Sequence, residues 1–191
     1  MKRAVILHGT SSHPTHNWQP WIKQELETVG YEVFAPVLPD NDVPNRHTYE
    51  DFLKNSGWDF TDNILVGHSS GATAILNLLS TDWIPHIRAV VLVGAFLNED
   101  LLRDRDQCNE KQFANLFPNE GFDLEKIKQK VDHIYFVHGD KDPLCSFEDA
   151  RRLCGQLGGT FVSVAGAGHF STPTASLPEI ISTLKEHGDL L

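Results

Sequence analysis

Ser69 stands in a sequence context that could make it a nucleophile. It is the central residue of Gly-His-Ser-Ser-Gly at 67–71, with the apolar run 64–66 before it and a helix-forming run after it. A G-x-S-x-G pattern between a strand and a helix is typical of a serine on a sharp, strained turn that exposes its hydroxyl. The outer glycines leave room for backbones that pass too close to allow a Cβ atom. The alternative is a turn serine without chemistry.

Two later residues supply the base and the acid that an attacking serine needs. Asp142 lies in Val-His-Gly-Asp-Lys-Asp-Pro at 137–143, and His169 lies in Ala-Gly-Ala-Gly-His-Phe at 165–170, each after a predicted strand. A histidine can take the serine proton near neutral pH, and an aspartate behind it fixes the imidazole tautomer. The chain order Ser, Asp, His is that of α/β-hydrolases. These residues predict a catalytic triad for acyl transfer.

Other carboxylates compete for the role of the acid. Asp140 is the main rival of Asp142, and Glu99 or Asp100 after the fourth predicted strand is a more distant alternative. We prefer Asp142 because Asp140 lies closer to the strand end and Pro143 can rigidify the turn that presents residue 142.

Among the histidines, His169 is preferred because it alone lies in a glycine-lined loop after the last predicted strand. Its rivals are His8, His13, His16, His68 and His138.

Backbone N–H groups beside Ser69 could stabilise the oxyanion that forms during acyl transfer. Ser70 would begin a helix, where free N–H groups and the helix dipole favour negative charge. The loop after the first predicted strand, 8–12, would supply a second donor, and by position we expect it to be the backbone N–H of Thr10. Neither role requires the side chain of Thr10 or of Ser70.

The order of elements predicts how these residues are brought together. Apolar, β-branched runs alternate with helical stretches, which is typical of parallel strands covered on both faces. Strands are expected at 3–7, 31–37, 63–66, 88–93, 133–137 and 160–164, and helices at 18–29, 46–55, 70–80, 122–130, 146–157 and 176–187. We predict one domain, 1–191, with a doubly wound, mostly parallel sheet of about six strands and helices on both faces. The longer segment 96–132 could form a small cap, although an ordinary solvated helix and loop is the favoured interpretation.

Composition and charge narrow the classes of partner. The formal net charge is −10, with 26 acidic against 16 basic residues, so a phosphate backbone would be repelled and nucleic-acid binding is not expected. No apolar stretch is long enough for a membrane span, and the N-terminal apolar run 4–7 is too short for a signal peptide. We therefore expect a cytoplasmic protein without membrane attachment. Cys108, Cys145 and Cys154 form no C-x-x-C pair, which argues against a disulfide framework and a zinc ribbon.

No metal site or nucleotide site is expected either. His13 and His16, with His8 nearby, have neither a cysteine nor a convincing fourth ligand beside them, so a polar loop is the better interpretation. No G-x-G-x-x-G follows the first predicted strand, which removes the dinucleotide fingerprint. The sequence therefore predicts neither a metal loop at these histidines nor a dinucleotide site.

With these motifs in place, the chain resembles the small serine hydrolase family of retinoblastoma-binding protein nine and the bacterial YdeN proteins, within the α/β-hydrolases. The resemblance runs over nearly the full length, and its more particular marks are the tryptophan-rich stretch and the GHSSGA turn. It is carried by VILHG at 5–9, NWQPWIKQELE at 17–27, LPD at 38–40, GHSSGA at 67–72 and GAGHF at 166–170.

The resemblance implies a compact hydrolase with little or no lid, a triad of Ser69, Asp142 and His169, and no cofactor. Members of this family are similar to esterases that act on small acyl substrates. The association of the mammalian relative with retinoblastoma protein involves a Leu-x-Cys-x-Glu type of motif. Here Cys108 is preceded two positions earlier by Asp106, not by leucine, so that partner is not carried over.

The sequence thus predicts a serine hydrolase, most readily a carboxylesterase of small, short-chain acyl esters that works through an acyl-enzyme. Residues near the catalytic loops could line its pocket, although each could equally belong to the core: Trp18, Phe96, Leu144, Cys145 and Phe170. For Cys145 a buried, small apolar role is favoured over an exposed thiol. A peptidase, amidase or thioesterase would use the same triad, and an interaction module with incidental activity is an alternative of another class. We expect a small-molecule acyl substrate and a monomer or weak homodimer.

Overall fold

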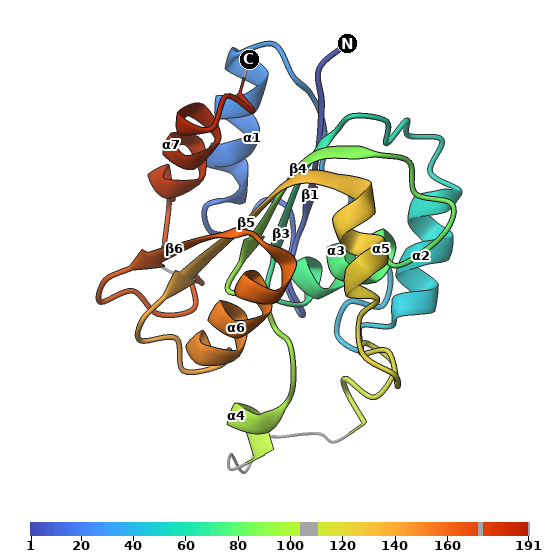
Figure 1. Ribbon diagram of the computed structural model, residues 1–191, viewed down its shortest axis with the longest axis vertical. Coiled ribbons are helices and arrows are strands. Elements are labelled where there is room, and N and C mark those ends of the chain that lie inside the picture. The colour runs from blue at the N-terminus through green and yellow to red at the C-terminus, as the bar shows by residue number, and fades with distance from the viewer. Residues whose placement is uncertain (104–110, 172–173, 191) are drawn as a thin grey trace.

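The computed structural model describes residues 1–103, 111–171 and 174–190, and contains one sheet of six strands (Figure 1). All neighbouring strands are parallel, in the order β2-β1-β3-β4-β5-β6. The strands are β1 (Arg3–Leu7), β2 (Glu32–Phe34), β3 (Ile64–His68), β4 (Ile87–Val93), β5 (Val131–Gly139) and β6 (Thr160–Val164). The expected doubly wound α/β-hydrolase fold is confirmed.

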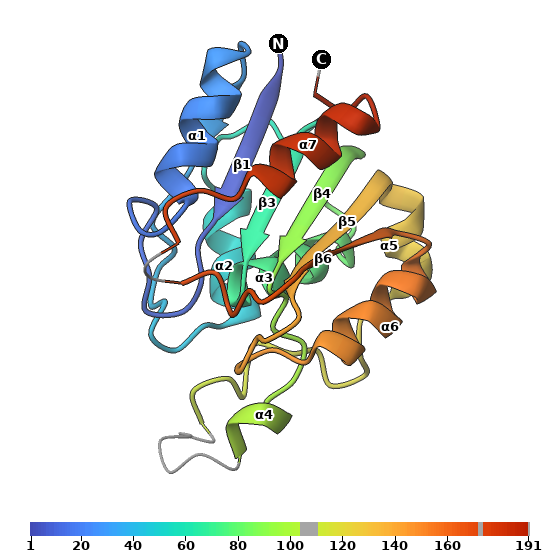
Figure 2. The same cartoon turned by 90° about the vertical axis from the view of Figure 1, so that its left-hand side faces the viewer.

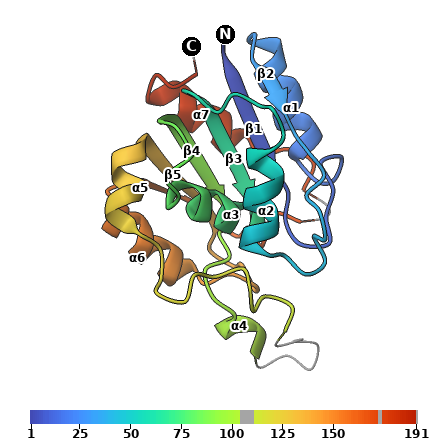
Figure 3. The same ribbon diagram turned by 90° about the vertical axis from the view of Figure 1, so that its right-hand side faces the viewer.

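Helices cover both faces of this sheet. They are α1 (Gln19–Thr28), α2 (Arg46–Lys54), α3 (Ser70–Leu79), α4 (Asp100–Arg103), α5 (Leu124–Lys130), α6 (Phe147–Leu157) and α7 (Pro178–Glu186). Figure 2 shows α1 and α7 in front of one face, and Figure 3 shows α2 and α3 in front of the other. Each layer has its own apolar core, one joining the sheet to α1 and α7 and the other joining it to α2, α3, α5 and α6.

Burial on both faces explains why the central strands read as continuous apolar runs. Every residue of β3 is buried, and β4 is buried except at Arg88. Their register pairs Leu65 with Val90 and Val66 with Val91, so successive side chains enter the two cores alternately. Within the part of the chain that the structure describes, no helix is long and apolar enough to cross a membrane.

The expected elements differ from the observed ones mainly at their ends. The second strand is shorter than the predicted 31–37, and β5 is longer than the predicted 133–137. The short helix α4 was not expected, because the charged stretch that contains it has no helical apolar face. Cys108 and the departure from the retinoblastoma motif lie outside the described residues.

Parallel strands bring their carboxyl ends to one edge of the sheet, where the predicted site residues follow β1, β3, β5 and β6. The chain that follows β4 extends past this edge to α4 (Figure 2). Both termini lie at the opposite end of the sheet (Figure 1). The candidate site is therefore at the carboxyl edge, where open α/β sheets bind their ligands.

Candidate active site

The backbone at Ser69 is strained, as its sequence context predicts. Its φ is 55° and its ψ is −121°, in the turn that joins β3 directly to α3. A Cβ at Gly67 would lie 2.7 Å from the backbone N of Ala72, and one at Gly71 would lie 2.3 Å from the carbonyl oxygen of Leu7. Larger residues would push these backbones apart. The two glycines thus let the chain turn tightly enough to hold Ser69 at the edge of the sheet.

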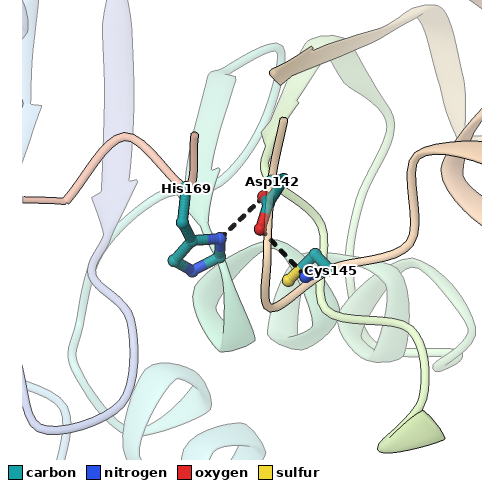
Figure 4. Close-up of side chains that lie close together, drawn as sticks. All are labelled: Asp142, Cys145 and His169. Carbon is teal, nitrogen blue, oxygen red and sulfur yellow. Dashed lines mark hydrogen bonds and ion pairs between the residues drawn. The ribbon is translucent and has the colours of Figure 1, made fainter. Parts of the chain in front are cut away.

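His169 and Asp142 form a buried hydrogen-bonded pair beside this turn (Figure 4). His169 Nδ1 lies 2.8 Å from Asp142 Oδ2, and the two side chains are 8% and 0% exposed. With Nδ1 donating to the carboxylate, the other ring nitrogen, Nε2, is left to accept a proton. Gly94, at the end of β4, packs against the pair, since a Cβ there would lie 3.3 Å from His169 Nδ1.

The Asp142 carboxylate is held ionised by its hydrogen bonds. Burial by itself would raise its pKa, but the hydrogen bond from His169 and those from the backbone N–H groups of Cys145 and Leu144 outweigh burial and lower the pKa. The two backbone groups donate to Oδ1 at 2.9 and 2.8 Å. One carboxylate oxygen is therefore fixed by the turn, and the other is left for His169.

Asp140, the rival acid, has a different partner. Its side chain is exposed, and its Oδ1 accepts a hydrogen bond of 2.7 Å from the backbone N–H of Gly166. This bond ties the loop after β5 to the loop that carries His169. Asp100, the more distant alternative, begins α4, beyond the carboxyl edge of the sheet (Figure 2). The structure thus brings Asp142, and not Asp140, onto the imidazole.

Three other histidines are buried around the site, and backbone groups form hydrogen bonds with their ring nitrogens. His8 Nε2 accepts from the Leu38 N–H at 2.9 Å, His68 Nε2 donates to the His169 carbonyl at 2.8 Å, and His138 Nε2 donates to the Cys145 carbonyl at 3.1 Å. Burial lowers the pKa of His8 and of His138, and it lowers the pKa of His68 to about 3. All three are neutral at neutral pH and position the loops around them.

The two loops expected to hold the oxyanion are joined to each other. The Thr10 hydroxyl donates to Ser70 Oγ at 2.8 Å, which fixes the loop after β1 against the start of α3. Ser70 is the first residue of α3, so its backbone N–H has no acceptor within the helix. The positive end of the helix dipole also points at this position. Thr10 therefore has a side-chain role that the sequence did not predict.

A cavity of about 320 Å³ opens at this edge of the sheet. It is lined at the strand ends by Gly9, Thr10, His68, Ser69 and His169. We call its large apolar lining residues the apolar wall: Phe96, Leu102, Phe113 and Leu144. We call its remaining polar lining residues the polar wall: Ser11, Ser12, His16, Asn17 and Ser171. Ser69 and His169 thus share one cavity, although no hydrogen bond joins Ser69 Oγ to His169 among the described residues.

The expected pocket residues are divided between the cavity and the core. Phe96 and Leu144 belong to the apolar wall. Trp18 and Phe170 were named for the pocket, but they are at most 4% exposed and do not line the cavity. Cys145 is also buried and does not line the cavity, which confirms the small apolar role favoured for it. Trp18 and Phe170 pack in the core under α1 and α7, with the Trp18 ring edge-on to His68 at 5.6 Å. Nearness in sequence to a catalytic loop could not separate wall from core.

Several wall residues were missed by the sequence analysis. The polar wall comes mainly from the loop after β1, which was considered only for oxyanion binding and metal ligation. Leu102 and Phe113 come from the segment 96–132, for which a solvated helix and loop was the favoured interpretation. The apolar residues of this segment, among them Phe113 and Leu116, were its only signal, because solvated loops seldom bury large apolar side chains.

Cys145 lies beside Asp142 and does not line the cavity (Figure 4). Among the described residues, the group that could gather three metal-ligand atoms consists of Asp142, Cys145 and His169, with these atoms within 4.8 Å of one another (Figure 4). Burial and the Asp142 charge raise the pKa of the Cys145 thiol well above its ordinary value, although a hydrogen bond with Ser69 acts in the other direction. A protonated thiol is a poor metal ligand. Since Asp142 and His169 already bind each other, we interpret the group as an acid–base pair beside a buried thiol.

Comparison with known proteins gives relatives along nearly the whole chain. Serine hydrolase RBBP9 of Rattus norvegicus is 25% identical over 186 residues, which cover 96% of this chain and 94% of the relative. YdeN of Bacillus subtilis (strain 168) is 25% identical over 190 residues, which cover 97% of this chain and 96% of YdeN.

Solved structures share the fold. The crystal structure of the ydeN gene product from B. subtilis matches with a TM-score of 0.84 at 24% identity, covering 98% of this chain and 99% of that chain. Carboxylesterase CesB (YbfK) from B. subtilis matches with a TM-score of 0.68 at 16% identity, covering 97% of this chain and 82% of that chain. The family model described as serine hydrolase matches residues 4–186, and the chain therefore belongs to the serine hydrolase family.

Proposed function

We propose that this serine hydrolase is a carboxylesterase that cleaves small, short-chain acyl esters through an acyl-enzyme, with Ser69, His169 and Asp142 as its triad. The observation that carries the proposal is the 2.8 Å contact between His169 Nδ1 and Asp142 Oδ2, beside a strained serine on the same cavity. The cavity of about 320 Å³ suits a small substrate, since ligand pockets run from about 300 to 1,000 Å³. CesB, which shares the fold, is a carboxylesterase.

In the proposed reaction, Ser69 Oγ attacks the ester carbonyl carbon while His169 Nε2 takes the hydroxyl proton. The carbonyl electron pair moves to oxygen, and the backbone N–H groups of Thr10 and Ser70 stabilise that oxyanion. When the carbonyl re-forms, the bond to the alcohol oxygen breaks and His169 returns the proton to it. Asp142 stabilises the imidazolium in between.

Water then repeats the sequence on the acyl-enzyme. His169 Nε2 takes a proton from water as the water oxygen bonds to the acyl carbon. Collapse of the second tetrahedral intermediate breaks the bond to Ser69 Oγ, which recovers its proton from His169. The products are a carboxylic acid and an alcohol, and no further reactant is needed.

The test combines covalent labelling with a substrate series. A fluorophosphonate should label the wild type and the matched control Ser80→Ala, and should not label Ser69→Ala. Turnover of p-nitrophenyl esters should be highest for short acyl chains and should fall by at least about a thousand-fold in Ser69→Ala. A folded wild-type protein that takes no label would refute the hydrolase mechanism. Thioester or anilide analogues turned over faster than matched esters would refute the carboxylesterase assignment alone.

A further inference from the structure

The cavity is chemically two-sided, and the fold explains why. Ser69 follows β3, which lies between β1 and β4 in the sheet. The loop after β1 therefore reaches the cavity from one side of Ser69, and the loops after β4 and β5 reach it from the other. The first loop supplies serine, histidine and asparagine side chains, and the other two supply phenylalanine and leucine. The chain after β6, which carries Ser171, crosses the carboxyl ends of the strands toward the loop after β1 (Figure 2).

The apolar wall is part of a small apolar cluster of its own. Phe96 and Phe113 have ring centroids 4.7 Å apart, and Leu102 and Leu144 pack against them. This cluster is separate from the two cores of the sheet. Such a wall favours an apolar chain in contact with it.

Two residues of the polar wall are connected along the chain to the surroundings of His169. Ser171 follows His169 by two residues, and Asn17 directly precedes Trp18, which shares the core under α1 and α7 with Phe170. In the proposed reaction His169 protonates the departing oxygen, so the alcohol part of the ester lies beside this imidazole. The alcohol part therefore meets the polar wall, and the acyl part meets the apolar wall.

The lining of the cavity has hydrogen-bonding capacity that the protein does not use. Ser12 Oγ and His68 Nδ1 are buried, yet neither has a hydrogen-bond partner among the described residues. Because His68 Nε2 donates to the His169 carbonyl, the unused His68 Nδ1 is an acceptor. Buried polar atoms without partners are costly, and at a binding site they indicate groups that a ligand completes.

The backbone of the polar wall is held in an uncommon conformation. Ser11 and Asn17 have φ values of 49° and 55°, and neither is glycine. Hydrogen bonds fix this loop, since the Ser11 N–H donates to the Asn41 carbonyl and the His16 N–H donates to the His13 carbonyl. Strain of this kind accumulates at ligand sites.

The charge of the site indicates which alcohols fit. Among the described residues that line the cavity, none is a carboxylate, a lysine or an arginine. The net charge of −10 also disfavours anionic substrates. Resting on the carboxylesterase function proposed above, we infer that the substrates are esters of a short apolar acyl group with a neutral, hydroxyl-bearing alcohol, whose hydroxyls bind the polar wall through Ser12.

The experiment uses two esters that differ only in hydroxyl groups, glycerol 1-monobutyrate and n-propyl butyrate. Both form the same butyryl-enzyme, so a difference in kcat/KM reports the step in which the alcohol leaves. Each kcat/KM is divided by the alkaline hydrolysis rate of that ester, which removes the difference in intrinsic reactivity. We expect the wild type to favour the glycerol ester by about ten-fold or more, as two or more new hydrogen bonds would give.

Ser12→Ala should lower kcat/KM for the glycerol ester by about three- to ten-fold and leave that for the propyl ester within about two-fold. Ser182→Ala, on the exposed face of α7, is the matched control and should change neither value. Ser171→Ala is a second arm of the test should Ser12→Ala fail to fold, and it should show the same selective loss.

The inference would be overturned if the wild type gave equal corrected kcat/KM values for the two esters. It would also be overturned if the polar-wall variants lost equal factors in kcat/KM for both esters. Hydrolysis of p-nitrophenyl butyrate by the same wild-type preparation separates the two proposals. If that ester is cleaved while the glycerol preference is missing, only the alcohol specificity is wrong. If no ester is cleaved, the proposed function itself fails.

Discussion

Two buried aspartates pair with histidines in this molecule, at opposite ends of the sheet. At the carboxyl end, His169 Nδ1 lies 2.8 Å from Asp142 Oδ2. At the other end, His133 Nδ1 lies 2.8 Å from Asp189 Oδ1. Both carboxylates are shielded, with exposed fractions of 0% and 4%. A short, shielded contact between an aspartate and a histidine, such as that of Asp142 with His169, therefore does not by itself identify a catalytic pair.

The surroundings make the difference. Asp189 also accepts a 2.6 Å hydrogen bond from the Tyr135 hydroxyl, and its carbonyl accepts from the Tyr31 hydroxyl at 3.1 Å. These bonds fix the chain after α7 to the sheet, while the His133 side chain remains 49% exposed. The Asp142 pair instead shares a cavity with a strained serine and the start of a helix. An Asp–His pair becomes a candidate for catalysis only where the strand ends supply a nucleophile and oxyanion donors.

Removing the charge of each aspartate in turn should separate these roles. Asp142→Asn is expected to lower kcat about ten-thousand-fold, because the amide no longer holds the imidazole in the required tautomer. Asp189→Asn is expected to leave kcat/KM within about two-fold, because distant sites act independently, and to lower the free energy of unfolding by about 1–3 kcal/mol. Steady-state hydrolysis of p-nitrophenyl butyrate and urea unfolding measure the two effects.

The comparison would fail if both variants lost activity in proportion to their stability. It would also fail if Asp189→Asn were the less active of the two under conditions in which both are folded.

Gly94 allows a smaller test of how closely the proposed catalytic pair, His169 and Asp142, is packed. Its φ is 51°, and a Cβ there would lie 3.3 Å from His169 Nδ1 and 3.4 Å from Asp142 Oδ2. Gly94→Ala should therefore lower kcat by about 3- to 10-fold, because such a contact moves its neighbour by a few tenths of an ångström and a displacement of 1 Å costs about 100-fold. Gly158→Ala is the matched control, with a φ of 70° and open space around its Cβ.

In the control, only the free energy of unfolding should fall, by about 1 kcal/mol. Measurements of kcat and of the free energy of unfolding on both variants separate an effect on the pair from a general loss of stability. Equal kcat values would show that the pair tolerates displacement.

The buried histidines at the carboxyl end should make stability depend on pH. The pKa values of His8, His68 and His138 are lowered by burial, so in the folded protein they stay neutral where the unfolded chain, with ordinary values near 6.5, takes up protons. Their contribution is complete above about pH 6.5 and is lost as the pH falls. For His68, whose folded pKa is about 3, the loss approaches about 1.4 kcal/mol per pH unit between about pH 6 and pH 4.

Urea unfolding at pH 7, 6 and 5 measures this slope. His138→Gln keeps an N–H donor for the Cys145 carbonyl and should flatten it. An unchanged free energy of unfolding between pH 7 and pH 5 in the wild type would contradict the expectation. Asp142, whose pKa is lowered, acts in a more acidic range, since its contribution is lost only below about pH 4.

The sequence predicted the fold well because the fold depends on patterns that are local. The apolar runs that form β1, β3 and β4 are buried on both faces. Gly67 and Gly71 lie where neighbouring backbones leave no room for a Cβ atom, as their motif predicts. The walls of the cavity were harder to predict, because Trp18 and Phe96 look alike in sequence although one lies in the core and the other at the cavity. The pair at Asp189 was not foreseen, since it joins residues that are 56 positions apart without any motif.

Asp140 provides the last and smallest test, because it was the rival of Asp142 in sequence. Its exposed carboxylate accepts from the Gly166 N–H at 2.7 Å and so orients the loop of His169 without touching the imidazole. Asp140→Asn retains an acceptor oxygen, so kcat should fall no more than about five-fold. Asp140→Ala removes the acceptor and should have the larger effect of the two, with an unchanged pH profile of kcat/KM because the acid behind His169 is still present. A loss comparable to that of Asp142→Asn would move the catalytic acid to Asp140, and the contact between Asp142 and His169 would then be structural, like that between Asp189 and His133.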